Sequence, residues 1–121
     1  MKGGKGNKAV KPIIITLCGS TKFYKEFQIA YYQETTKGKI VLSVGFYPYT
    51  QKEIHGEEIG ITKEQKIKLD ELHKRKIDIS DEVLILNVGG YIGKSTQHEI
   101  EYARKLNKKI IYLEEVKQEG E

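Results

Sequence analysis

The stretch from Asn87 to Glu99 constrains the fold more than any other part of the chain. An apolar run that ends at Val88 passes into three glycines, and a helical pattern follows with two hydroxyl residues near its start. This succession is typical of a strand, a tight turn and a helix N-terminus in a parallel α/β sheet, where small-molecule sites form at the carboxyl ends of the strands. The segment therefore predicts both a fold class and the place of a binding site.

Glu99 has two possible roles in this segment. Thr96 and Glu99 have the spacing of a capping box, in which the Thr96 hydroxyl accepts from the Glu99 backbone N–H and the Glu99 carboxylate accepts from the Thr96 N–H. Alternatively, the carboxylate is a nucleophile, and the hydroxyls and free helix N–H groups hold an anionic ligand beside it. The local pattern leaves both roles open.

Apolar runs alternate with helical patterns along the rest of the chain. The first run follows Pro12 and is too continuous for a half-exposed strand, which favours a parallel sheet covered on both faces. Thr62-x-x-Gln65 predicts a capping box at the start of a helix over residues 62–79. Further helices are predicted after the first strand and after the glycine turn. Strands are predicted over residues 13–18, 40–44, 82–86 and 109–113.

This alternation predicts a three-layer α/β domain of the flavodoxin-like or Rossmann-like kind. Right-handed crossovers favour a four-stranded parallel sheet with strand order 2-1-3-4. In that order the sheet reverses direction between the first and third strands. The loop at Gly19 and Ser20 and the loop over residues 89–96 are then expected to face each other across one crevice.

The loop Gly19-Ser20-Thr21 is the second candidate binding segment. Glycine allows a tight turn and a close approach of a ligand to the backbone, while Ser20 or Thr21 can cap the following helix. Neither the Walker spacing nor Gly-x-Gly-x-x-Gly is present. The candidate substrate or phosphate ligands on the two loops are Gly19, Ser20, Thr21, Gly93, Ser95 and Thr96.

Length and charge bound the remaining possibilities. A chain of 121 residues predicts one domain, over residues 12–116. Residues 1–11 are predicted to be a flexible basic tail, the charged chain from Glu114 is expected to fray, and residues 117–121 form a frayed tail. The four lysines of the first tail largely explain the net charge of +4, so composition does not indicate a nucleic-acid partner.

Cysteine and histidine usage is sparse. A lone cysteine, Cys18, excludes an internal disulfide and fits a reducing cytosol.

There is no apolar run of roughly 18 residues, so no membrane association is expected and the protein is predicted to be cytoplasmic. Three scattered histidines and one cysteine lack metal-ligand spacing, and no metal or cofactor is predicted. His55, in the loop over residues 45–60, is expected to be solvated.

The succession of motifs resembles the nucleoside 2-deoxyribosyltransferase-like superfamily. The resemblance covers nearly the whole chain beyond the basic tail. It implies cleavage of the N-glycosidic bond of a (deoxy)nucleoside or nucleoside monophosphate, by hydrolysis or deoxyribosyl transfer, with Glu99 as the nucleophile. It also implies a homo-oligomer. The motifs are Leu17-Cys18-Gly19-Ser20, Ser80-Asp81-Glu82-Val83-Leu84, Gly93-x-Ser95-Thr96-x-x-Glu99-Ile100-x-Tyr102-Ala103 and Lys109-Ile110-Ile111.

Two positions differ from the pattern of that superfamily. His73 stands where an aspartate is common, and Leu17 and Cys18 stand where a tyrosine is usual. As an imidazolium, His73 can supply the proton that the leaving base needs; its other reading is favourable electrostatics at a helix carboxyl end. Two alternatives to catalysis stay open: a non-catalytic binder of a nucleotide or nucleotide-derived signal, and a small α/β interaction protein without a ligand.

Overall fold

The computed structural model describes residues 10–44 and 62–116, whose strands form one parallel sheet. The strand order is β2-β1-β3-β4, and each neighbouring pair is parallel. The predicted α/β class and the predicted strand order are therefore confirmed. The strands are β1 (Ile14–Cys18), β2 (Ile40–Leu42), β3 (Glu82–Ile85) and β4 (Lys109–Tyr112).

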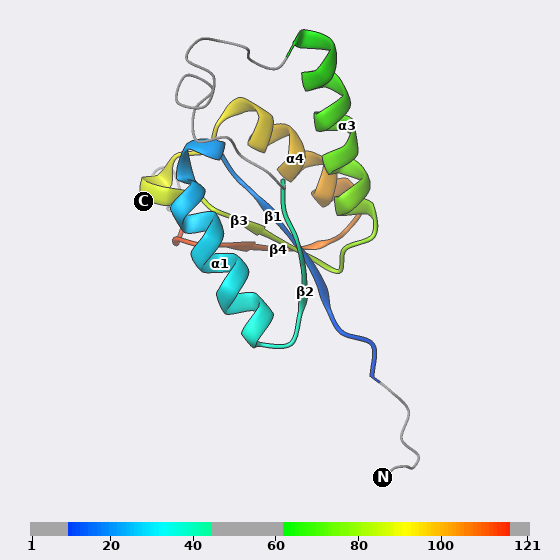
Figure 1. Ribbon diagram of the computed structural model, residues 1–121, viewed down its shortest axis with the longest axis vertical. Coiled ribbons are helices and arrows are strands. Elements are labelled where there is room, and N and C mark those ends of the chain that lie inside the picture. Colours follow the sequence, from blue (N-terminus) through cyan, green and yellow to red (C-terminus); the bar gives the residue numbers. More distant parts are fainter. Residues whose placement is uncertain (1–9, 45–61, 117–121) are drawn as a thin grey trace.

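Helices cover both faces of this sheet and complete the three layers (Figure 1). The α-helix α1 packs on one face, whereas α3 and α4 pack on the other. Two short 3-10 helices follow strands β1 and β3. Among the described residues the helices are η1 (Thr21–Phe23), α1 (Tyr24–Thr36), α3 (Lys63–Asp78), η2 (Val88–Gly90) and α4 (Lys94–Lys105).

Alternate residues of the central strands supply the two halves of the core. Ile15 and Leu17 of β1 pack toward α1, while Cys18 packs with Ile77 of α3 and Ile100 of α4. Successive side chains of a strand point to opposite faces, and both faces here are covered. This is why β1 and β3 read as continuous apolar runs rather than as alternating ones.

Two helix starts differ in how they are capped. Thr62 and Gln65 form the predicted capping box, with both hydrogen bonds at 3.0 Å. Helix α4 instead begins at Lys94 with Gly93 as its N-cap, and no side chain of the described residues caps it. The capping box expected between Thr96 and Glu99 is therefore wrong, because both residues lie inside the helix.

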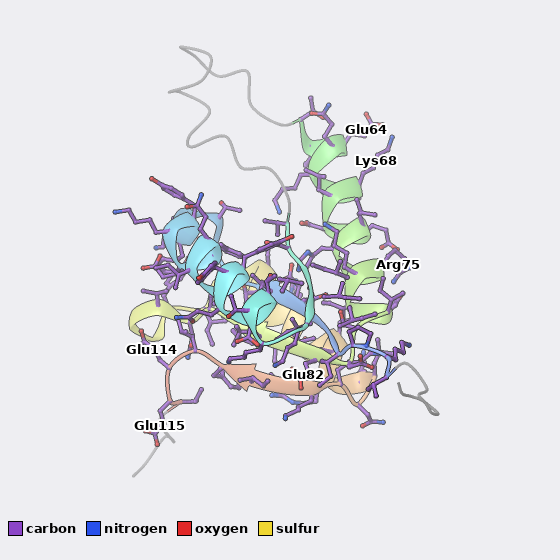
Figure 2. The ribbon with its side chains drawn as sticks, turned by 60° about the horizontal axis from the view of Figure 1, so that its bottom comes forward. Glu64, Lys68, Arg75, Glu82, Glu114 and Glu115 are labelled. Atoms are coloured by element: carbon purple, nitrogen blue, oxygen red, sulfur yellow. The ribbon has the colours of Figure 1, made fainter. Side chains whose placement is uncertain are left out.

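The segment after β4 belongs to the folded domain. Asn87, which is 2% exposed, donates to the Glu114 carbonyl at 3.0 Å and accepts from the Glu114 N–H at 2.9 Å. The Glu114 carboxylate also accepts from the Gly89 N–H at 3.0 Å, beside the loop after β3 (Figure 2). The expectation that the chain frays from Glu114 is wrong, since Glu114 anchors the glycine loop.

The amino edge of the sheet carries a partly buried charge cluster. Lys39 lies 2.9 Å from Glu34 at the end of α1 and 2.9 Å from Glu82 at the start of β3. Glu82 lies in the sheet (Figure 2), and its carboxylate is also 3.8 Å from Lys109. These contacts join α1, β2, β3 and β4 at the edge opposite the glycine loops.

Several expectations lie outside the described residues. They are most of the basic tail over residues 1–11, the loop over residues 45–60 with His55, and the tail over residues 117–121. Within the two described stretches, no helix combines the length and the apolar character needed to cross a bilayer.

Candidate active site at the carboxyl edge of the sheet

The two predicted binding loops lie side by side. Cys18 pairs with Ile85 in the parallel register of β1 and β3, so both loops leave the sheet at the same edge. The Lys22 ammonium lies 3.8 Å from the ring centroid of Tyr91, and the Phe23 ring meets Tyr91 edge-on with centroids 5.9 Å apart. The predicted juxtaposition of the loops is present, and the aromatic contact through Tyr91 was not foreseen.

Gly19 is required for packing between the first loop and β3. A Cβ at this position would lie 3.1 Å from the Leu86 Cβ and 3.3 Å from the Leu86 carbonyl oxygen. The structure thus gives a steric reason for the glycine that differs from the expected approach of a ligand. Ser20 caps the short helix η1 by accepting from the Lys22 N–H at 3.3 Å, and Thr21 is exposed.

The N-terminus of α4 presents backbone donors next to that loop. The Gln97 N–H reaches the Gly93 carbonyl at 2.9 Å, so the amides of Lys94, Ser95 and Thr96 precede the intrahelical ladder. Ser95 is exposed, whereas Thr96 is 3% exposed. The absence of a side-chain cap leaves these donors and the helix dipole available to an anion.

Glu99 turns away from this helix start and faces a cluster with His73 and Cys18. Its carboxylate lies 3.9 Å from His73 Nε2, and the Cys18 Sγ lies 3.3 Å from the same nitrogen. Cys18 is fully buried and His73 is 4% exposed, while the Glu99 side chain is 14% exposed. The three residues come from the end of β1, from α3 and from the second turn of α4.

A contact between the two helices fixes this geometry. Arg75 of α3 donates to the Tyr102 hydroxyl of α4 at 2.8 Å, and that hydroxyl donates to Asp78. Arg75 points away from the sheet on α3 (Figure 2), so the bridge spans the outer side of the helix pair. His73 and Glu99 lie on the buried side of the same two helices.

Burial controls the protonation of the cluster. It raises the pKa of Glu99 from 4.5 to about 7, and it raises the pKa of Cys18 well above 9.0. Burial, assisted by the nearby positive charge of Lys76, lowers the pKa of His73 from 6.5 to about 4. At neutral pH the cluster therefore holds a thiol, a neutral imidazole and a carboxyl group that is about half ionised.

The expected form of His73 needs correction in this light. The lowered pKa disfavours an imidazolium at neutral pH, and His73 lies inside α3 and faces the core rather than the end of the helix. Its Nδ1 is buried without a hydrogen-bond partner among the described residues. His73 is placed to act on Glu99 in its neutral form.

Glu99 is the most exposed member of the cluster. In the described part of the chain, hollows lie on α3 and on α4, and Glu99 lines neither of them. The cluster is reached through the partly exposed carboxylate itself. The first hollow is lined by Gln65, Lys68, Leu69 and Leu72, and the second by Glu101, Arg104 and Lys105.

Comparison with protein-family models and with curated proteins finds no match for this chain. The function is therefore argued from the geometry of the cluster and from the resemblance of the motifs.

Proposed function

We propose that this protein cleaves the N-glycosidic bond of a (deoxy)nucleoside or nucleoside monophosphate, with Glu99 as the nucleophile. A carboxylate oxygen of Glu99 forms a bond to the anomeric carbon as the bond from that carbon to the base breaks. The base leaves with the electron pair and takes a proton from water. Water or a second base then releases the sugar and frees Glu99.

The placement of Glu99 carries this proposal. A mostly buried carboxylate lies beside Cys18, the last residue of β1, and its helix α4 begins after the loop that follows β3. A carboxylate in low-dielectric surroundings stabilises oxocarbenium character more strongly than one in water does. Buried glutamates elsewhere in the fold pair with Lys39, whereas Glu99 faces His73.

The neighbouring groups fit the same reaction. The amides at the start of α4 and the hydroxyls of Ser20 and Ser95 suit a sugar hydroxyl or a 5′-phosphate. Glu99 follows Ser95 by four residues, which is about 6 Å along a helix. His73 serves as a positioning residue, because its neutral imidazole can donate a hydrogen bond to the carboxylate but carries no acidic proton at neutral pH.

One observation favours a second candidate, a non-catalytic binder of a nucleotide or nucleotide-derived signal. The pKa of Glu99 is raised to about 7, so part of the population carries a neutral carboxyl group at physiological pH. A neutral carboxyl group donates a hydrogen bond to a bound base or sugar but does not attack the anomeric carbon. The binder uses the same residues without turnover.

Base release by a matched pair of variants tests the proposal. Purine and pyrimidine nucleosides and their monophosphates are incubated with wild-type protein, Glu99→Gln and Glu101→Gln, and free base is measured by chromatography. We expect Glu99→Gln to lose at least about a hundredfold in rate, because a neutral amide cannot act as the nucleophile. Glu101→Gln changes an exposed carboxylate on the same helix and should keep the wild-type rate.

Ligand binding by the same proteins separates the two candidates. Release of no base by wild-type protein above the Glu99→Gln rate would overturn the enzymatic proposal. A thermal shift by a nucleotide, seen in that case without turnover, would establish the binder. If the panel gave no turnover and no thermal shift, both the enzymatic proposal and the binder would be contradicted.

A further inference from the structure

Cys18, His73 and Glu99 bring a thiol, an imidazole and a carboxylate together in one place. Among the residues that the structure describes, they form a group whose donor atoms all lie within 4.8 Å of one another. We propose that these three residues bind a divalent transition metal ion of the zinc type and leave a fourth coordination position open. The site goes beyond the proposed function and does not depend on it.

The distances are close to those of a tetrahedral ion. Ordinary zinc–sulfur, zinc–nitrogen and zinc–oxygen bond lengths place neighbouring ligand atoms roughly 3.4–3.6 Å apart. The Cys18 Sγ and His73 Nε2 are 3.3 Å apart, and Nε2 is 3.9 Å from the Glu99 carboxylate. The three ligand atoms lie within 4.8 Å of one another, so the carboxylate must move inward by about 1 Å. Glu99 is the member of the cluster that has room to move, because its side chain is partly exposed.

A nucleophilic triad does not account for the arrangement. In such a triad the acid contacts one imidazole nitrogen and the nucleophile contacts the other. Here the thiol and the carboxylate both face Nε2 of His73, and Nδ1 has no hydrogen-bond partner in the described part of the chain. The Cys18 thiol is also hydrogen-bonded to Glu99, so the three side chains converge on one point, where a metal ion can accept a lone pair from each of them.

Charge and donor type point to the same class of ion. A dication with a thiolate and a carboxylate has no net charge, which suits a site where Cys18 and His73 are buried. Thiolate and imidazole donors select zinc and similar ions over magnesium and calcium. Binding releases the thiol proton of Cys18 to solvent.

The open position lies on the side of Glu99, the ligand that retains exposure. Three protein ligands with an open fourth position are the pattern of catalytic rather than closed structural zinc sites. A bound ion would engage one carboxylate oxygen of Glu99 and draw electron density from the other. Metal binding is therefore expected to weaken nucleophilic attack by Glu99.

Cobalt titration of the full chain tests the site. The purified protein is freed of metal with a chelator, exchanged into chelator-free buffer and titrated with Co²⁺. We expect one equivalent to bind with the visible absorption of tetrahedral cobalt and a near-ultraviolet sulfur-to-cobalt band, both removed by Zn²⁺. The chain has one cysteine, so the sulfur band reports Cys18 without any substitution.

Variants then assign the other two ligands. His73→Gln and Glu99→Gln should each weaken Co²⁺ binding by at least about tenfold. His98→Ala, His55→Ala and Glu101→Gln are the matched controls and should bind as wild-type protein does. Circular dichroism shows which variants fold. If a ligand variant does not fold, the sulfur-to-cobalt band of the wild-type protein alone tests the site. Absence of saturable Co²⁺ or Zn²⁺ binding at micromolar concentrations, or binding without the sulfur band, would overturn the site.

Discussion

The position of Glu99 along α4 decides its chemistry. In a capping box its carboxylate would accept from backbone N–H groups, and hydrogen bonds to the charged form lower a carboxyl pKa. Helix α4 starts at the N-cap Gly93, three residues before Thr96, and Glu99 therefore lies against Cys18 and His73, where burial raises its pKa to about 7. Glu99 therefore changes charge in the neutral range, and its ionisation separates attack on a sugar from simple binding.

The pH dependence of base release follows from this pKa. If the carboxylate attacks, kcat/KM should rise about tenfold per pH unit below 7 and level off above it, because only the ionised form is a nucleophile. The rate is measured between pH 5 and about 9 with a chelator present. Glu101→Gln should keep the same profile. A rate that falls as the pH rises through 7 would instead identify Glu99 as the acid.

The sequence indicated Glu99 and His73 but not their third neighbour. Cys18 ends an apolar run, and nothing in that run shows which face of the sheet each residue occupies. The face of the sheet to which a side chain points alternates along the strand, and the helices on each face determine its neighbours. Both are known only once the topology is known. The buried surroundings that shift all three pKa values likewise depend on packing and not on spacing.

At the scale of elements, the order of strands and helices was predictable because few topologies were allowed. Continuous apolar runs required a covered parallel sheet, and right-handed crossovers then fixed the order that is observed. Helix starts were less certain, since Thr96 and Glu99 have the spacing of a capping box while Gly93 supplies the N-cap. The role of Glu114 was missed because it is a long-range contact to Asn87.

This contact makes the glycine loop depend on the segment after β4. Asn87→Ala should lower the free energy of unfolding by about 1–3 kcal/mol, because the Glu114 N–H and carbonyl lose their partners at a buried site. Glu114→Gln keeps those two bonds and an acceptor for the Gly89 N–H, so its effect should stay below about 1 kcal/mol. Urea unfolding measures the free energy of unfolding of both variants. Equal losses in the two variants would contradict the anchoring of the glycine loop by the Asn87–Glu114 backbone contact.

At the scale of the whole molecule, burial of the cluster couples its ionisation to stability. Raising the pKa of Glu99 from 4.5 to about 7 contributes stability that is present below pH 4.5 and lost as the pH rises to 7. Lowering the pKa of His73 from 6.5 to about 4 acts in the opposite direction, since that stability is present above pH 6.5 and lost as the pH falls to 4. Each contribution is about 3 kcal/mol.

In wild-type protein the pH-dependent stability changes due to Glu99 and His73 cancel over most of the acidic range. Variants that remove one of the two groups are expected to show the change due to the other. The main cause of both shifts is desolvation by burial, so removing one group leaves the shift of the other. Relative to wild-type protein, Glu99→Gln should gain stability as the pH rises from 4.5 to 7, because the loss due to Glu99 is gone. His73→Gln should lose stability relative to wild-type protein as the pH rises from 4 to 6.5.

The difference between each variant and wild-type protein is the quantity to measure, because every other carboxyl group then cancels. Urea unfolding at several pH values, with a chelator present, gives both differences. A uniform loss of stability from imperfect packing shifts a whole curve but leaves its slope unchanged, so the opposite slopes report the two buried groups directly. Slopes of the same sign, or flat differences in both variants, would show that solvent reaches Glu99 and His73 and that the cluster is not buried as the structure places it.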